Sequence, residues 1–189
     1  MRRFAALMCA GLMAIAMAGP AGAVADRWAV IGESSAITMS VRALGVTQTG
    51  RFGRWTGDIR FDPDAPEDAE VAITVRAASL TMRQAAVTQR AVGPGFLDAD
   101  RYPTIRFQLR ELEPTAPGRY TARADVTVRD RTRPVTFPVT LSVDGGVARM
   151  RGGFVLDRAD YGIGTQGAMN ALVARQVRVD VALATRRAS

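Results

Sequence analysis

The side chains that most often carry out acid–base, nucleophilic or metal chemistry are scarce in this sequence. Its 189 residues include no histidine and no lysine, and the single cysteine is Cys9. A nucleophilic triad therefore lacks its usual base, a zinc site lacks its usual ligands, and a haem lacks its common axial histidine. Only carboxylates remain for catalysis, so the composition argues against an enzyme, and no cofactor is expected.

Carboxylates gather at two places in the sequence. Asp157 and Asp160 flank Arg158, and we expect them to brace a loop rather than to catalyse a reaction. The other group surrounds a turn, but it lacks the spacing of a calcium-binding loop, so we interpret it as a solvated acidic turn and expect no metal site. This group consists of Asp58, Asp62, Asp64, Glu67 and Asp68.

The elements that must position any site are mainly β-strands. In residues 96–112 a loop runs to Tyr102-Pro103, after which Ile105, Phe107 and Leu109 alternate with polar residues. This period of two predicts a strand with one face on a core and the other in water. The pattern recurs in about eight segments, and turn signals such as Asp144-Gly145-Gly146 separate them.

Eight short strands at regular spacing predict an all-β fold, either a barrel or a sandwich. We favour a single antiparallel barrel, because the first and last segments both alternate and closure would remove exposed edges. The composition of residues 79–92 predicts one short helical insertion between strands, with Ser79 or Thr81 as its N-cap.

Residues 1–23 have the pattern of a cleaved secretory signal peptide. Arg2 and Arg3 precede an apolar run over residues 4–17, which is shorter than the ~20 residues of a membrane-spanning helix. The small residues Ala21-Gly22-Ala23 then match a cleavage site. We therefore expect an exported protein whose folded domain comprises residues 24–189 and contains no disulfide.

The basic residues do not indicate a nucleic-acid partner. The formal net charge of +7 falls to +5 without the two arginines of the expected signal peptide, and every basic residue is arginine. These arginines are spread over the outward positions of many segments, without a basic run or interleaved aromatic residues. We interpret them as a solvated surface.

The apolar interior of the barrel is the remaining place for a function. Eight strands enclose a space that is either just filled by side chains or able to hold one small ligand. Small inward residues (Ala122, Ala124 and Gly152) and the few large aromatic residues favour a cavity, but the pattern alone leaves a filled and a hollow barrel open.

Several short motifs follow one another in order along the chain. They are Gly57-Asp58-Ile59-x-Phe61-Asp62-Pro63, Phe96-Leu97-Asp98, Tyr102-Pro103-Thr104-Ile105-x-Phe107, Thr132-Arg133-Pro134-Val135 and Arg158-x-Asp160-Tyr161-Gly162-Ile163. Together they resemble the YceI-like, polyisoprenoid-binding proteins of the bacterial periplasm, and the resemblance covers the whole expected mature chain.

This resemblance implies an extended, lipocalin-like barrel that holds a long isoprenoid lipid, either a polyprenyl phosphate or a quinone-like molecule, for carriage or sequestration in the periplasm. It implies a binding protein and not an enzyme. The alternative is a ligand-free module that docks on envelope proteins through its arginine-rich exterior. Transient contact with the membrane and a homodimer stay open as further associations.

The resemblance also suggests which residues form the binding site. Arginines that could meet a phosphate or quinone head group are Arg83, Arg90, Arg101 and Arg158, of which Arg158 is favoured because it lies inside a family-like motif. The expected apolar lining of the tunnel is Phe52, Trp55, Ile73, Val75, Phe96, Ile105, Phe107, Val126, Phe137 and Phe154.

Overall fold

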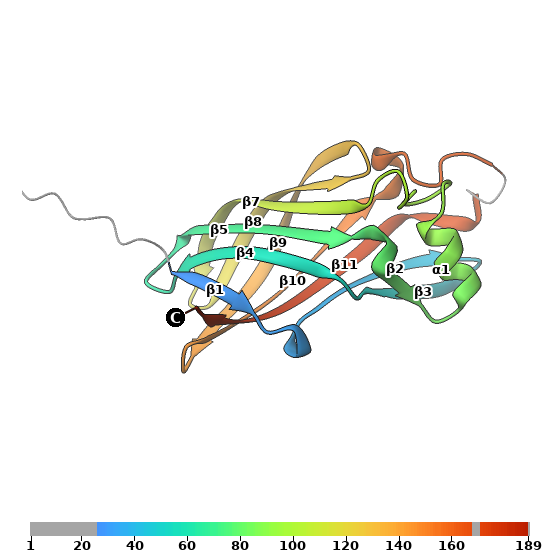
Figure 1. Ribbon diagram of the computed structural model, residues 1–189. Coiled ribbons are helices and arrows are strands. Elements are labelled where there is room, and N and C mark those ends of the chain that lie inside the picture. Colours follow the sequence, from blue (N-terminus) through green and yellow to red (C-terminus); the bar gives the residue numbers. More distant parts are fainter. Residues whose placement is uncertain (1–25, 168–170, 189) are drawn as a thin grey trace, which may run out of the picture.

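The computed structural model describes residues 26–167 and 171–188, and within them the chain forms one curved antiparallel sheet (Figure 1). The expected signal peptide, residues 1–23, lies outside the described residues. The strands are β1 (Arg27–Val30), β2 (Ala36–Ala43), β3 (Val46–Phe52), β4 (Trp55–Asp62), β5 (Ala65–Arg76), β6 (Leu80–Met82), β7 (Thr104–Ala116), β8 (Arg119–Val128), β9 (Arg131–Asp144), β10 (Val147–Asp157) and β11 (Val173–Arg187). The helical elements are α1 (Ala85–Val92) and the 3₁₀ turns η1 (Gly32–Ser34), η2 (Ala77–Ser79) and η3 (Arg158–Tyr161).

Eight of these strands close into the barrel that the alternating pattern predicts. The order is β1-β4-β5-β7-β8-β9-β10-β11, and β11 returns to β1 through the pairs Trp28–Arg187 and Val30–Thr185. The predicted closure between the first and last strands is therefore confirmed. Because the ring is closed, none of these eight strands is left as a free edge along its whole length.

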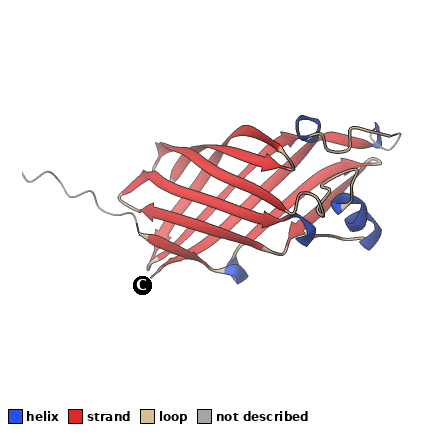
Figure 2. Cartoon of the chain, turned by 45° about the horizontal axis from the view of Figure 1, so that its top comes forward, coloured by secondary structure: helices blue, strands red, loops and turns tan. Residues whose placement is uncertain are grey.

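The other three strands, β2, β3 and β6, extend the barrel at one end. The long strand β11 pairs with β2 from Val173 to Ala182 and with β1 from Thr185 onward. At this change of partner the buried Ser35 hydroxyl accepts a bond from the Ala184 N–H (3.0 Å) and donates one to the Ile31 carbonyl (2.8 Å). Helix α1 lies at the same extended end (Figure 2).

The helix is shorter than the composition predicts. Residues Leu80–Met82 form β6 and pair with β3, so neither Ser79 nor Thr81 caps a helix. The cause is a close approach: a Cβ added to Gly50 on β3 would lie 2.7 Å from the Leu80 Cδ1 atom. Only glycine lets Leu80 pack directly onto β3, and this tertiary contact overrides the local helical preference.

Candidate functional site

One end of the barrel is filled with side chains. Trp28 on β1 is 2% exposed, and its indole N–H donates to the Phe61 carbonyl at 2.8 Å. The two aromatic rings contact each other, with their centroids 5.7 Å apart. Ala122 and Ala124 are also buried, and they belong to the packed core rather than to the wall of a cavity. This end therefore closes the interior.

The remainder of the interior is hollow. A cavity of about 460 Å³ is bounded by all eleven strands except β1 and β4, and by α1 and the loops at the extended end. This volume falls within the ~300–1,000 Å³ that is typical of ligand pockets. Its wall is apolar apart from Gln48, Arg90, Arg106 and Arg158, and no acidic residue of the described chain contributes to it. The structure thus decides between the filled and the hollow barrel.

The cavity is elongated along the strands. On β11 the lining residues alternate from Val177 to Leu183, and Val173 continues the wall beyond an irregularity in the pairing with β2. At ~3.3 Å per residue, the path from Val173 to Leu183 measures about 33 Å along the strand. Such a shape suits a long, thin apolar molecule better than a compact one.

Of the eleven residues predicted to bind a ligand, Trp55 alone lies outside the wall of the cavity. It is the first residue of β4 and packs, half-buried, against the apolar core. The structure brings the others together around the cavity; they are Phe52, Ile73, Val75, Phe96, Ile105, Phe107, Val126, Phe137, Phe154 and Arg158.

Three aromatic rings form the middle of the wall. The Phe137 ring centroid lies 6.2 Å from that of Phe107 and 5.1 Å from that of Phe154. A Cβ added to Gly152 would lie 2.9 Å from Cε2 of the Phe137 ring. The inference that Gly152, like Ala122 and Ala124, leaves empty space is therefore wrong, because Phe137 occupies the space beside this glycine.

The cavity reaches the surface at the extended end of the barrel. One face of α1, from Ala86 to Ala91, covers part of this opening, and Arg90 lies on that face. On the other side are Leu44, which is 67% exposed, and Leu172, which is 45% exposed. The Leu44 N–H donates to the Leu172 carbonyl at 2.9 Å, so the two leucines are held side by side.

Leu44 occupies an unusual backbone conformation. It is the first residue of the two-residue turn between β2 and β3, with φ +52°, and Gly45 follows with φ +78°. Turns with two positive φ angles prefer Asn-Gly or Asp-Gly. A side chain such as leucine in this left-handed region costs about 1–3 kcal/mol.

Arg158 has a structural role that the sequence did not reveal. It is 3% exposed, and its guanidinium donates to the carbonyls of Ile163 (2.7 Å), Gly164 (2.6 Å), Val173 (2.7 Å) and Ala174 (3.0 Å). These bonds join the loop after η3 to the beginning of β11. Burial lowers the pKa of Arg158, and the neighbouring carboxylate of Asp157 opposes that shift.

The other candidate arginines occupy different positions. Arg90 lines the opening of the cavity, whereas Arg83 and Arg101 are exposed and lie outside its wall. The Arg101 guanidinium lies 5.2 Å from the centre of the Tyr102 ring. Arg106 also contributes to the wall. It is nevertheless exposed, and it pairs with Thr74 on β5, so it lies on the outward face of its strand as the alternation predicted.

Tyr161 is a buried polar residue beside this loop. It is 2% exposed, and its hydroxyl has no hydrogen-bond partner among the residues that the structure describes. Burial raises the pKa of this phenol to about 12. Asp157 accepts hydrogen bonds from the Ala159 N–H and from Arg175, so the expectation that Asp157 braces the loop is confirmed.

The family model of the YceI-like domain matches residues 28–185. The chain belongs to the YceI-like family. A UPF0312 protein of Vibrio parahaemolyticus is 30% identical over 164 residues, which cover 82% of this chain and 87% of that protein.

Solved structures share the same fold. BcnA of Burkholderia cenocepacia superposes with a TM-score of 0.77 at 22% identity, covering 82% of this chain and 98% of BcnA. A structure described as a polyisoprenoid binding domain from Saccharophagus degradans, implicated in plant cell wall breakdown, has a TM-score of 0.65 at 13% identity. It covers 87% of this chain and 99% of that domain. At these identities the likeness shows the lipocalin-like fold of the family and nothing finer.

Residues 26–167 and 171–188 contain no helix that is long and apolar enough to cross a bilayer. Within the same ranges, no three acidic, histidine or cysteine side chains are grouped so as to hold a metal ion.

Proposed function

We propose that this YceI-like protein is a periplasmic carrier that holds a long isoprenoid lipid in its cavity, for transport or sequestration. The observation that carries the proposal is the elongated cavity, whose wall is apolar except at a few positions. The description of a structural relative as a polyisoprenoid binding domain supports the same ligand class.

The physical reason for such a carrier is the cost of exposing hydrocarbon to water. Each methylene-sized unit of an isoprenoid tail costs ~0.8 kcal/mol in water. A cavity whose lining extends about 33 Å along β11 can shield many such units at once, so the bound lipid can cross an aqueous compartment. Only the head group then needs to remain at the opening.

The charges of the wall support a head group that is anionic or rich in hydrogen-bond acceptors. Of the three arginines that border the cavity, Arg106 is exposed on the outward face of β7, which leaves Arg90 and Arg158, and acidic residues of the described chain do not line the cavity. Because the bonds of Arg158 are directed at backbone carbonyls, Arg90 at the opening is the better candidate to meet a phosphate or a quinone oxygen. Export to the periplasm is part of this proposal, and the signal-like pattern of residues 1–23 supports it.

The direct experiment is to purify the protein from the periplasm and to identify extracted lipids by mass spectrometry. We expect a co-purifying polyprenyl lipid, or uptake of polyprenyl phosphate, the matching alcohol or a quinone by the delipidated protein. Replacing Arg90 by Gln should weaken the binding of the polyprenyl phosphate more than the binding of the matching alcohol. If no lipid is extracted and none is taken up, the proposal is wrong.

A further inference from the structure

The opening of the cavity carries an exposed apolar surface, which we define as the apolar rim: Leu44, Val46 and Leu172. Their exposed fractions are 67%, 60% and 45%. Leu44 lies in the turn between β2 and β3, Val46 is the first residue of β3, and Leu172 precedes β11. Because the Leu44 N–H is bonded to the Leu172 carbonyl, the rim is one continuous feature and not a set of scattered residues.

The rim is unfavourable for the isolated protein in two independent ways. Large apolar side chains are exposed to water, and Leu44 adopts a left-handed conformation that Asn or Gly would take without strain. Burial of the rim against an external apolar phase would remove the cost of exposure and would offset the cost of the strained turn.

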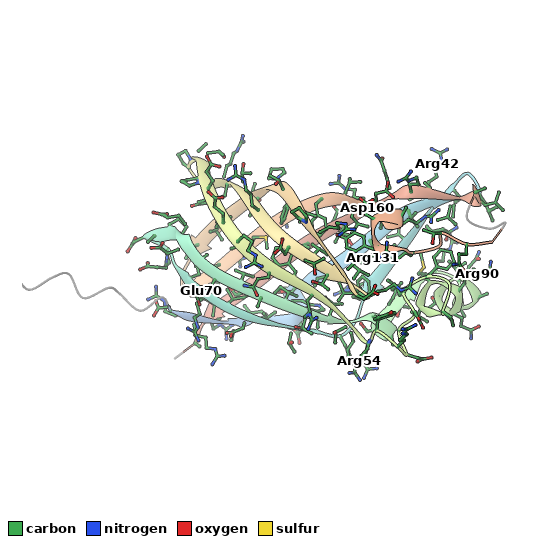
Figure 3. All side chains as sticks on the ribbon, turned by 90° about the horizontal axis from the view of Figure 1, so that it is seen from above. Arg42, Arg54, Glu70, Arg90, Arg131 and Asp160 are labelled. Atoms are coloured by element: carbon green, nitrogen blue, oxygen red, sulfur yellow. The ribbon has the colours of Figure 1, made fainter. Side chains whose placement is uncertain are left out.

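The charges around the rim indicate what that phase is. Arg42, Arg83 and Arg90 are exposed at this end of the barrel, and none of them forms an ion pair with any residue that the structure describes. Figure 3 shows Arg42 and Arg90 at one end of the molecule and Glu70 at the other. Apolar side chains surrounded by unpaired arginines are complementary to the interface of an anionic bilayer.

We propose that the apolar rim docks on the surface of an anionic phospholipid bilayer, with Arg42, Arg83 and Arg90 facing lipid phosphates. This inference rests on the proposed lipid-binding function, because docking places the opening of the cavity directly against the hydrocarbon. A tail then slides from the bilayer into the cavity without crossing water. The filled end of the barrel, with Trp28, points away from the membrane.

The test is the binding of the purified protein to vesicles of neutral phosphatidylcholine, with or without phosphatidylglycerol, in the absence of any isoprenoid. We expect the protein to bind the anionic vesicles preferentially and to be released by salt. Val46→Glu should weaken this binding at least tenfold, because it places a negative charge in the rim. Leu44→Asn should also weaken it, while leaving the turn intact.

The matched control is Val143→Glu. Val143 is an exposed valine beside the β9–β10 turn, at the opposite end of the barrel, and this substitution changes the net charge by the same amount. We expect the Val143→Glu variant to bind anionic vesicles with the affinity of the wild type. The proposal is overturned if the wild type does not bind anionic vesicles, or if Val46→Glu and Val143→Glu have equal effects.

A second measurement separates docking from lipid binding. Val46 does not line the cavity, so Val46→Glu should bind a polyprenyl phosphate from detergent solution with unchanged affinity but take it up more slowly from anionic vesicles. Uptake from vesicles at the wild-type rate would refute docking. If no variant binds the lipid from detergent, the proposed function fails, whereas the vesicle-binding result still stands by itself.

Discussion

Filling the cavity from within should have opposite effects on ligand affinity and on stability. Val179 lies on β11 and lines the cavity. It pairs with Met39 on the neighbouring strand β2 and with Phe154 on the neighbouring strand β10. We choose Val179→Phe because it extends a ring into the hollow without adding a charge or removing a hydrogen bond. A cavity of about 460 Å³ can accept the ring without the crowding that a filled core would suffer.

The expected size of the effect follows from the number of carbon atoms. Phenylalanine has roughly four more side-chain carbons than valine, and at ~0.8 kcal/mol per methylene-sized unit these displace about 3 kcal/mol of buried ligand tail. Since each 1.4 kcal/mol is about tenfold in affinity, binding should weaken by roughly two orders of magnitude. The ligand-free protein should become about 0.5–2 kcal/mol more stable, as other cavity-filling substitutions do.

The assay compares two quantities in the same preparation. Affinity for a polyprenyl phosphate is measured by titration calorimetry, and the free energy of unfolding of the delipidated protein is measured by urea denaturation. The matched control is Val155→Phe, the same change on the neighbouring strand at an exposed outward position. We expect the control to leave both quantities nearly unchanged.

Two results would refute this reasoning. Wild-type affinity in Val179→Phe would mean that the tail does not occupy this part of the cavity. A loss of stability in the same variant would mean that the space around Val179 is not available to a side chain.

Three further predictions concern the wall and the loop that borders it. Phe107→Arg should leave the protein folded, as judged by circular dichroism, but abolish lipid uptake, because a charge would stand in the apolar wall. Arg158→Gln should lower the free energy of unfolding by at least about 3 kcal/mol, since buried carbonyls lose their donors, and a smaller loss in urea denaturation would contradict the structural role of Arg158. For Tyr161, whose pKa is raised to about 12, the folded protein keeps its proton while the unfolded chain ionises, so stability should fall as pH rises from about 10 to about 12, by roughly 2–3 kcal/mol. Tyr161→Phe should abolish this alkaline loss in urea denaturation, and a loss of equal size in the variant would exclude the phenol as its cause.

The features that the sequence predicted correctly depend on local chemistry. Residues before proline avoid the helical region, so Tyr102-Pro103 fixed the end of a loop, and β7 begins at Thr104 as expected. Gly145 and Gly146 both have positive φ, as the predicted hairpin requires. The alternation of β7 predicted correctly that Ile105 and Phe107 face the interior.

The features that the sequence did not predict depend on contacts between distant segments. The contact between Gly50 and Leu80 replaced part of the expected helix with β6, and these two residues belong to different elements. The location of the cavity was also not predicted, because it results from the balance of side-chain volumes across several strands. Phe137 fills the space beside Gly152, so the size of a single residue did not indicate whether its surroundings are empty.

The packing of Trp28 against Phe61 fills one end of the barrel, so within the described residues we expect a ligand to enter the cavity from the extended end. We expect a bound ligand to leave through the opening by which it entered, so a second ligand can bind only after the first has left. Under the proposed function, we expect the depth of the cavity to limit how many isoprene units are shielded, with any further units protruding past Leu44. We therefore expect ligand exchange to be sequential, and we expect the longest chain that is shielded completely to be set by the distance from the opening to the packed end of the barrel.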